Sequence, residues 1–215
     1  MHVTRPELTI LYKDRFTAVV DKPGGLLSVP GRRPENQDCV VNRLRRLYPD
    51  CIKQPAVHRL DMYTSGLMVL ALTKEAHRHL CRQFEQRSVE KLYIAVLNGI
   101  VSQVSGEITL AFRLDTTNRP HQVYDPARGK PGTTVWKKLQ CADGKTRVEF
   151  RPLTGRTHQL RLHAAHALGL NCPIAGDRLY GGGAEGEPML LHASYLSFQH
   201  PDSGRRMEFS SPAPF

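Results

Sequence analysis

The sequence predicts an α+β fold, because short strand-like segments and isolated helical segments follow one another without strict alternation. The chain has 215 residues and 40% hydrophobic content, which suffices to bury a substantial core in one domain. The C-terminal half is the richer in strands. Residues 133–140 and 145–153 are joined across a short segment ending in Gly144, which indicates a hairpin with a glycine-assisted turn.

The N-terminal half predicts two strands and two helices. Strands are expected at residues 10–12 and 17–20, on either side of a turn at 13–15. Apolar residues at helical spacing predict a helix over 40–48, with Asp38 as a possible N-cap and Pro49 as its stop. The apolar run 67–72 predicts a buried strand. A second helix, reaching Phe84, is expected behind Thr73 as its cap.

Two further segments of the C-terminal half have a clear pattern. Residues 118–132 combine Pro, Gly and cations, which predicts an exposed loop. Residues 159–168 predict a helix that Gly169 closes at its C-terminal end.

Charge and cysteine content limit the function classes. Thirty Lys and Arg against twenty Asp and Glu give a formal net charge of +10, which favours polyanionic partners, nucleic acid first, although many soluble proteins carry such a surface without binding through it. No apolar run is long enough to cross a bilayer and the first six residues lack the hydrophobic core of a secretory signal, so we expect a cytoplasmic protein. Five cysteines without a Cys-x-x-Cys predict reduced thiols.

The ten histidines suggest a metal site only at first sight. His163 and His166 could share a helix face, but no His-Glu-x-x-His motif accompanies them and no acidic residue lies between His158 and His166. A zinc site needs three or four ligands in defined geometry. We therefore expect no metal.

One carboxylate is presented beside the apolar strand at 67–72. The segment His-Arg-Leu-Asp-Met-Tyr-Thr-Ser-Gly runs from His58 to Gly66, and its Thr-Ser-Gly end can turn the backbone sharply. The cation of Arg59 favours the ionised form of Asp61, which can act as a nucleophile or a base. An Asp that only forms an ion pair or ends a loop is the simpler alternative.

This nonapeptide resembles the signature His-Arg-Leu-Asp-x-x-Thr-Ser-Gly of the RluA-type pseudouridine synthases, and every fixed position of the signature is present. Further segments resemble motifs of the same family in the same order, so that the resemblance covers nearly the whole chain. They are residues 21–26, 91–99, 154–163, 173–181 and 190–193.

The resemblance implies a large, mostly antiparallel mixed sheet with flanking helices and a central RNA cleft. Residues 1–9 would be a short N-terminal arm and residues 10–215 the catalytic domain, without an appended RNA-binding domain. It also implies an isomerase that converts uridine in RNA to pseudouridine without a cofactor. We expect the protein to be a monomer.

Three residues match the catalytic positions of the family. Asp61 would be the catalytic carboxylate, Tyr93 would stack on the target base and can take part in proton transfer, and Arg156 would pair with the carboxylate. Whether Asp61 attacks the sugar, attacks the base or removes a proton from C2′ stays open.

Other residues are expected to hold the RNA. By the resemblance, Arg59 would fill the place that a flipped nucleotide leaves in the RNA stack, which offsets part of the cost of flipping, and Leu160 would pack near the base. Arg32, Arg33 and Arg119 lie in basic loops suited to phosphate contacts. The motif residues expected to fix loop geometry are His58, Thr64, Ser65, His158 and His192.

The RNA substrate within the family is inferred from three short segments. Residues 28–32, 82–84 and 118–120 look most like the dual-specificity members of the family, which modify uridines in a 23S rRNA hairpin and in the tRNA anticodon stem-loop. Residues 169–172 form a longer connection than many members have. The alternatives are a synthase for rRNA or tRNA alone, a non-catalytic RNA-binding or chaperone protein, and a glycosidase, which usually needs a second carboxylate.

Overall fold

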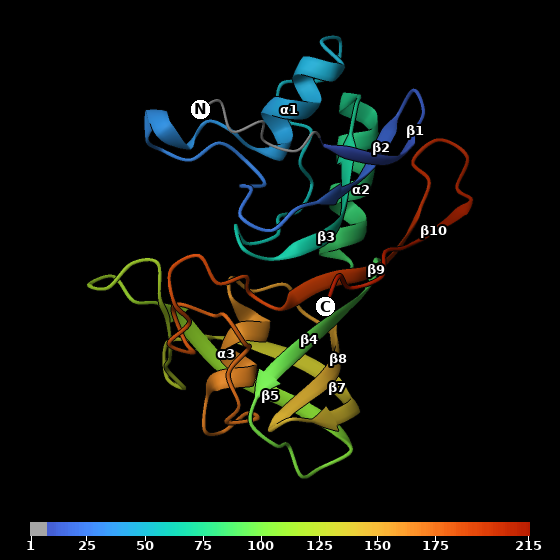
Figure 1. Ribbon diagram of the computed structural model, residues 1–215. Helices are drawn as coiled ribbons and strands as arrows, with labels where there is room; N and C mark the ends of the chain where they lie inside the picture. The colour runs from blue at the N-terminus through green and yellow to red at the C-terminus, as the bar shows by residue number, and fades with distance from the viewer. Residues whose placement is uncertain (1–7) are drawn as a thin grey trace. The chain divides into compact units, whose positions relative to one another are not determined.

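The computed structural model describes residues 8–215, so residues 1–7 of the expected N-terminal arm lie outside it. The chain forms two compact units. Unit 1 consists of the chain up to Val89 together with Tyr195–Ser211, and unit 2 consists of Glu90–Ser194 and Pro212–Phe215. The hydrogen-bonded strand order is β1-β2-β3-β9-β4-β8-β7-β5-β6, with β10 beside β9. This large sheet and its few helices confirm the predicted α+β class (Figure 1).

Unit 1 contains a short antiparallel sheet and two α-helices. Its strands are β1 (Thr9–Lys13), β2 (Thr17–Lys22), β3 (Ser65–Ala71), the second part of β9 (Leu191–Gln199) and β10 (Arg206–Ser210). Its helices are the 3₁₀ turn η1 (Pro34–Asn36), α1 (Val40–Leu47) and α2 (Lys74–Glu85). The pairs β1–β2, β2–β3 and β9–β10 are antiparallel.

The N-cap predicted for α1 was wrong by one residue. Cys39 is the cap, because its backbone is extended and its sulfur accepts the N–H of Asn42 at 3.4 Å. Asp38 instead forms an ion pair with Arg43 at 2.8 Å. Helix α1 ends before Pro49, as predicted.

The core of unit 1 lies between α2 and the sheet. Thr73 caps α2 as predicted and accepts the N–H of Ala76 at 3.2 Å. Helix α2 then places Leu80, which is fully buried, against β3 (Figure 1). The buried residues of this core are Val19, Leu67, Val69, Ala71, Ala76, Leu80, Val89, Leu196 and Phe198.

Unit 2 is built on long antiparallel strands. They are the first part of β9, β4 (Glu90–Asn98), β8 (Lys145–Pro152), β7 (Lys130–Ala142), β5 (Ser105–Leu114) and β6 (Gln122–Tyr124), in this spatial order. The predicted β7–β8 hairpin is confirmed. Its turn residues Asp143 and Gly144 both have positive φ, 52° and 71°, as tight hairpin turns require. Helix α3 (Gln159–Ala165) lies against β5 and β7.

Two predicted boundaries in unit 2 were wrong. The segment 118–132 is not one loop, since it contains the short strand β6 and the start of β7. Helix α3 ends at Ala165 rather than at residue 168, because the carbonyl of His163 accepts the N–H of Leu170 and the chain folds back. A Cβ atom on Gly169 would lie 2.1 Å from that carbonyl oxygen, so only glycine permits this return.

No helix within residues 8–215 is long and apolar enough to cross a membrane.

Candidate active site

The turn that carries Asp61 is fixed by a residue far away in the sequence. The hydroxyl of Ser28, which is buried, donates to the carbonyl of Leu60 at 2.6 Å and accepts the N–H of Leu60 at 3.0 Å. The turn also closes on itself, since the N–H of Thr64 donates to the carbonyl of Asp61 at 3.2 Å. The backbone on both sides of the carboxylate is therefore held in one conformation.

Lys22, the last residue of β2, also forms hydrogen bonds to this turn. Its side chain is fully buried, and its ammonium donates to the carbonyls of Pro23 at 3.0 Å, Leu26 at 2.7 Å and Met62 at 3.0 Å. The carbonyl of Met62 accepts a second hydrogen bond from the N–H of Gly25 at 2.9 Å. Three acceptors match the three donors of an ammonium group, so this geometry suits the charged lysine.

The charge of Lys22 interacts with Asp61. Burial lowers the pKa of Lys22 to about 7, and the carboxylate of Asp61 opposes this shift. The sequence interpretation assigned the neighbouring cation to Arg59, whose side chain is exposed. A buried cation thus adds to the electrostatic environment of Asp61, and the sequence interpretation gave Lys22 no such role.

His58 makes contacts of the kind expected for a scaffold residue. Its Nε2 accepts the N–H of Val69 at 3.1 Å, and its ring stacks on Phe84 with the ring centres 4.6 Å apart. These contacts tie the start of the signature to β3 and α2.

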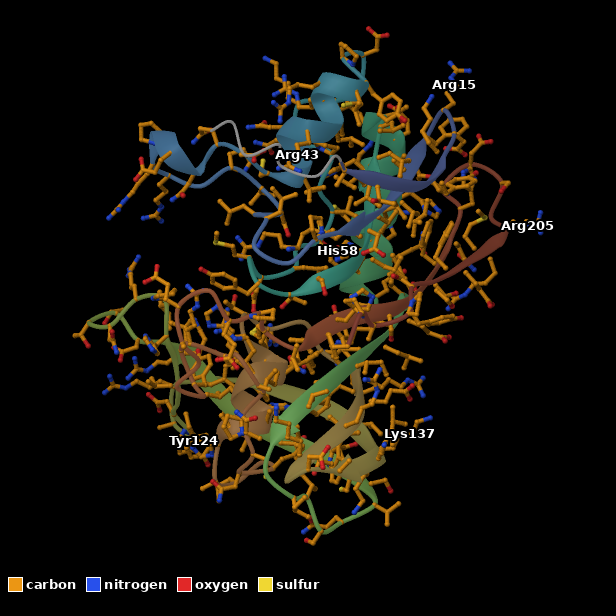
Figure 2. All side chains as sticks on the ribbon, viewed as in Figure 1. Arg15, Arg43, His58, Tyr124, Lys137 and Arg205 are labelled. Carbon is orange, nitrogen blue, oxygen red and sulfur yellow. The ribbon has the colours of Figure 1, made fainter. Side chains whose placement is uncertain are left out.

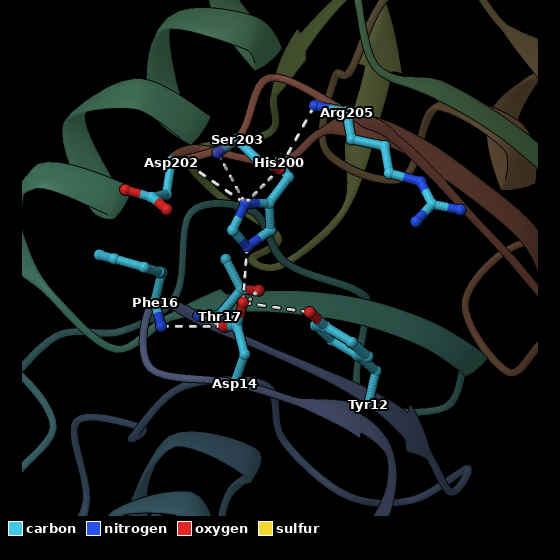
Figure 3. Close-up of polar contacts among 8 residues, drawn as sticks. All are labelled: Tyr12, Asp14, Phe16, Thr17, His200, Asp202, Ser203 and Arg205. Atoms are coloured by element: carbon cyan, nitrogen blue, oxygen red, sulfur yellow. Dashed lines mark hydrogen bonds and ion pairs between the residues drawn. The ribbon is translucent and has the colours of Figure 1, made fainter.

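A second polar cluster of unit 1 contains a carboxylate, an imidazole and a hydroxyl (Figure 3). Asp14 lies 2.6 Å from Nε2 of His200, and Nδ1 of His200 lies 3.1 Å from the hydroxyl of Ser203. The backbone N–H of Ser203 also donates to Nδ1 at 3.1 Å, which engages the lone pair that a general base would use. Asp14 also accepts hydrogen bonds from Thr17 and Tyr12. The cluster therefore acts as a structural brace, that is, it links the β1–β2 turn to the β9–β10 turn.

In unit 2, a buried glutamine builds the turn that carries Arg156. The side-chain oxygen of Gln159 accepts the hydroxyl of Thr154 at 2.7 Å and the N–H of Arg156 at 3.0 Å. Its side-chain nitrogen donates to the carbonyl of Thr133 and to the hydroxyl of Thr134, both at 2.9 Å. The guanidinium of Arg156 is exposed and donates through Nε to the carbonyl of Pro131 at 3.2 Å.

The remaining predicted residues of unit 2 differ in burial. Tyr93 lies on β4 opposite Phe150 and is partly buried. Leu160 lies on α3 and is 7% exposed, which makes it part of the core of this unit. Arg119 is exposed.

The structure therefore distributes the predicted site residues over both units. Unit 1 holds Asp61, Arg59, Arg32 and Arg33, and the three arginines are exposed. Unit 2 holds Tyr93, Arg119, Arg156 and Leu160. Sequence reasoning gave no role to four residues that build these segments, although all four lie in segments that it singled out. They are Lys22, Ser28, Gln159 and Tyr180.

Within residues 8–215, no group of three or more His, Cys, Asp or Glu side chains is arranged to hold a metal ion.

Comparison with known proteins gives a consistent result. Residues 17–166 match the model of a family described as RNA pseudouridylate synthase. The Escherichia coli (strain K12) protein named dual-specificity RNA pseudouridine synthase RluA is 45% identical over 214 residues, which cover 98% of this chain and 95% of that protein. The Yersinia pestis protein of the same name is 43% identical over 212 residues, covering 97% and 100%.

Solved structures agree with the fold. Human RNA Pseudouridylate Synthase Domain Containing 1 superimposes with a TM-score of 0.77 and 32% identity, over 99% of this chain and 87% of that chain. Human RNA Pseudouridylate Synthase Domain Containing 4 gives a TM-score of 0.74 over 96% and 88%, and its 24% identity supports the fold alone.

Proposed function

Because this chain belongs to the RNA pseudouridylate synthase family, and is thus an isomerase, we propose that it converts specific uridines to pseudouridine in a 23S rRNA hairpin and in the tRNA anticodon stem-loop. The support for two RNA classes is the name of the relatives, dual-specificity RNA pseudouridine synthase, at 42–45% identity over nearly the full chain. Both RNAs offer loops whose bases can be splayed out, as sequence-specific recognition usually requires. We further propose that residues 10–215 act as one catalytic domain, as a monomer, in the cytoplasm.

The reaction is an isomerisation that needs no oxidant or reductant. The bond between N1 and C1′ breaks, the uracil turns, C5 bonds to C1′, and the proton of C5 is lost while N1 gains one. We propose Asp61 as the carboxylate that attacks or removes a proton. The observation that carries this proposal is the construction of its turn, where Ser28 and Lys22 bind the carbonyls on either side of Asp61 at 2.6 Å and 3.0 Å. Such fixed geometry is what a reacting group needs.

The other roles rest on the family motifs. We propose that Tyr93 stacks on the target base, that Arg156 orients the carboxylate and that Leu160 packs beside the base. Arg59 fills the space of the flipped nucleotide. Exposure supports phosphate contacts for the three basic loop residues Arg32, Arg33 and Arg119.

The test is a pseudouridine assay of purified protein on both RNAs, without added metal or cofactor. Asp61→Asn keeps the shape of the side chain, so we expect it to bind RNA normally and to form no product. Asp50→Asn is the matched control, because Asp50 is exposed in the same unit. Product on one RNA only would indicate a single-substrate synthase. Unchanged product with Asp61→Asn would refute the catalytic role, and RNA binding without product by the wild type would indicate a non-catalytic RNA-binding protein.

A further inference from the structure

The loop that carries Arg119 is closed by its own hydrogen bonds. The carboxylate of Asp115 accepts the N–H and the hydroxyl of Thr117 at 3.1 and 2.7 Å and the N–H of Asn118 at 3.3 Å. The N–H of Asp115 donates to the carbonyl of His121 at 2.8 Å, and the N–H of His121 donates to the carbonyl of Asn118 at 3.0 Å. Arg119 is thus exposed at the tip of a small ordered loop that leads into β6.

The turn that carries Arg156 ends at a residue with an unusual backbone. His158 has φ 56° and ψ 18°, the left-handed conformation, and directly precedes α3. For a residue other than glycine this conformation is strained, so it persists where surrounding contacts impose it. The side chain of His158 does not cap the helix.

One hydroxyl joins these two segments. The oxygen of Tyr180 accepts the N–H of Gln122, the first residue of β6, at 2.8 Å, and it lies 2.9 Å from Nδ1 of His158. A tyrosine oxygen can accept a hydrogen bond and donate its own proton, so one hydroxyl can serve Gln122 and Nδ1 of His158 together. The ring of Tyr180 also meets the rings of His121 and His158 edge to face, with centres 5.8 and 5.7 Å apart.

Tyr180 is itself held rigidly. Its N–H donates to the carboxylate of Asp177 at 3.2 Å, and the guanidinium of Arg161 lies 5.2 Å from the centre of its ring. Arg161 and Asp177 form two hydrogen bonds of 2.7 Å to each other, and both side chains are almost completely buried. A buried two-point ion pair of this kind allows little movement.

We propose that Tyr180 is a positioning residue that sets the Arg119 loop and the Arg156 turn relative to each other through its hydroxyl group. This inference rests on the proposed function, in which both arginines contact the RNA or the reacting carboxylate. Tyr180 acts through Gln122 and His158. Loss of its oxygen leaves the fold intact and removes the common anchor of the two basic segments.

The experiment is Tyr180→Phe, which removes the oxygen and keeps the ring beside Arg161. The control is Tyr124→Phe, because Tyr124 lies on β6 (Figure 2) and its hydroxyl makes no hydrogen bond within residues 8–215. We expect Tyr180→Phe to lower the single-turnover rate about tenfold, because the hydrogen bonds that anchor both segments are lost, and the control to match the wild type. The thermal midpoint should fall by only a few degrees in Tyr180→Phe, which leaves the fold intact at the assay temperature, and should not change in the control.

Two readouts separate positioning from a general structural effect. In ¹⁵N spectra of the imidazole, the Nδ1 resonance of His158 should shift in Tyr180→Phe but not in the control. In RNA binding, the energetic coupling between Arg119→Ala and Arg156→Gln should be present in the wild type and lost in Tyr180→Phe.

An unchanged rate and unchanged coupling in Tyr180→Phe would overturn the inference. A wild type that forms no pseudouridine would overturn the proposed function instead, and the imidazole spectrum and the coupling in RNA binding would still decide the role of Tyr180.

Discussion

Replacing Lys22 by Met should remove a pH-dependent part of the stability of this protein. Burial lowers the pKa of Lys22 from an ordinary 10.5 to about 7, with Asp61 opposing the shift. Between these two values the unfolded chain binds more protons than the folded chain, so the free energy of unfolding rises with pH across this window. Below pH 7 the contribution of Lys22 to the free energy of unfolding is constant and at its least favourable. For one group with these two pKa values, the gain from pH 7.5 to 9.5 is about 2–3 kcal/mol.

The assay is urea denaturation at pH 7.5 and at pH 9.5. The difference in the free energy of unfolding between the two pH values should be smaller in Lys22→Met than in the wild type by about 2–3 kcal/mol. Lys74→Met is the control, because Lys74 is exposed at the start of α2, and it should keep the increment of the wild type. Comparison with the wild type cancels the other groups that titrate in this range. An increment in Lys22→Met as large as in the wild type would refute the reasoning.

Two further predictions concern RNA binding and the acid range. Replacing Arg32 and Arg33 by Gln should flatten the dependence of log affinity on log salt by about 0.7 per lost phosphate contact. The control is the same charge change at Arg15 and Arg205, which are exposed (Figure 2), and it should have the smaller effect. Equal slopes for the two double variants would place Arg32 and Arg33 outside the RNA path. Burial lowers the pKa of His163 to about 4, so stability falls as the pH drops below the ordinary value of 6.5. Between pH 7.5 and 4.5, the free energy of unfolding should fall by about 2–3 kcal/mol less in His163→Leu than in the wild type. Equal decreases in the two proteins, measured by chemical denaturation, would contradict this.

Local patterns in the sequence were sufficient for the elements that depend on neighbours. Helix α2 was predicted with its cap because its apolar spacing and Thr73 lie within a few residues of each other. The three-residue strand β6 was missed because it is too short to show alternation, and it exists by pairing with β5. Helix α3 ends early because Gly169 lets the chain return onto His163, a contact that spacing alone does not show.

The candidate site likewise has a part that the sequence alone predicts and a part that it does not. The signature around Asp61 is contiguous, so the sequence identified it. The groups that fix it are distant: Ser28 contacts Leu60 across 32 positions, and Lys22 contacts Met62 across 40. A lysine at the end of an apolar strand reads as a surface residue until the acceptors for its three protons are known. Tyr180 is similar, because the 58 positions that separate it from Gln122 hide their hydrogen bond.

The brace between Asp14 and His200 has a consequence for the order of folding. The two residues are 186 positions apart, and unit 1 also takes Leu196 and Phe198 into its core. A ribosome must therefore release nearly the whole chain before unit 1 can be completed, whereas Glu90–Ser194 forms nearly all of unit 2 from one continuous stretch. During synthesis, the strands β1, β2 and β3 wait with an open sheet edge until β9 arrives, which makes this interval the one most exposed to aggregation.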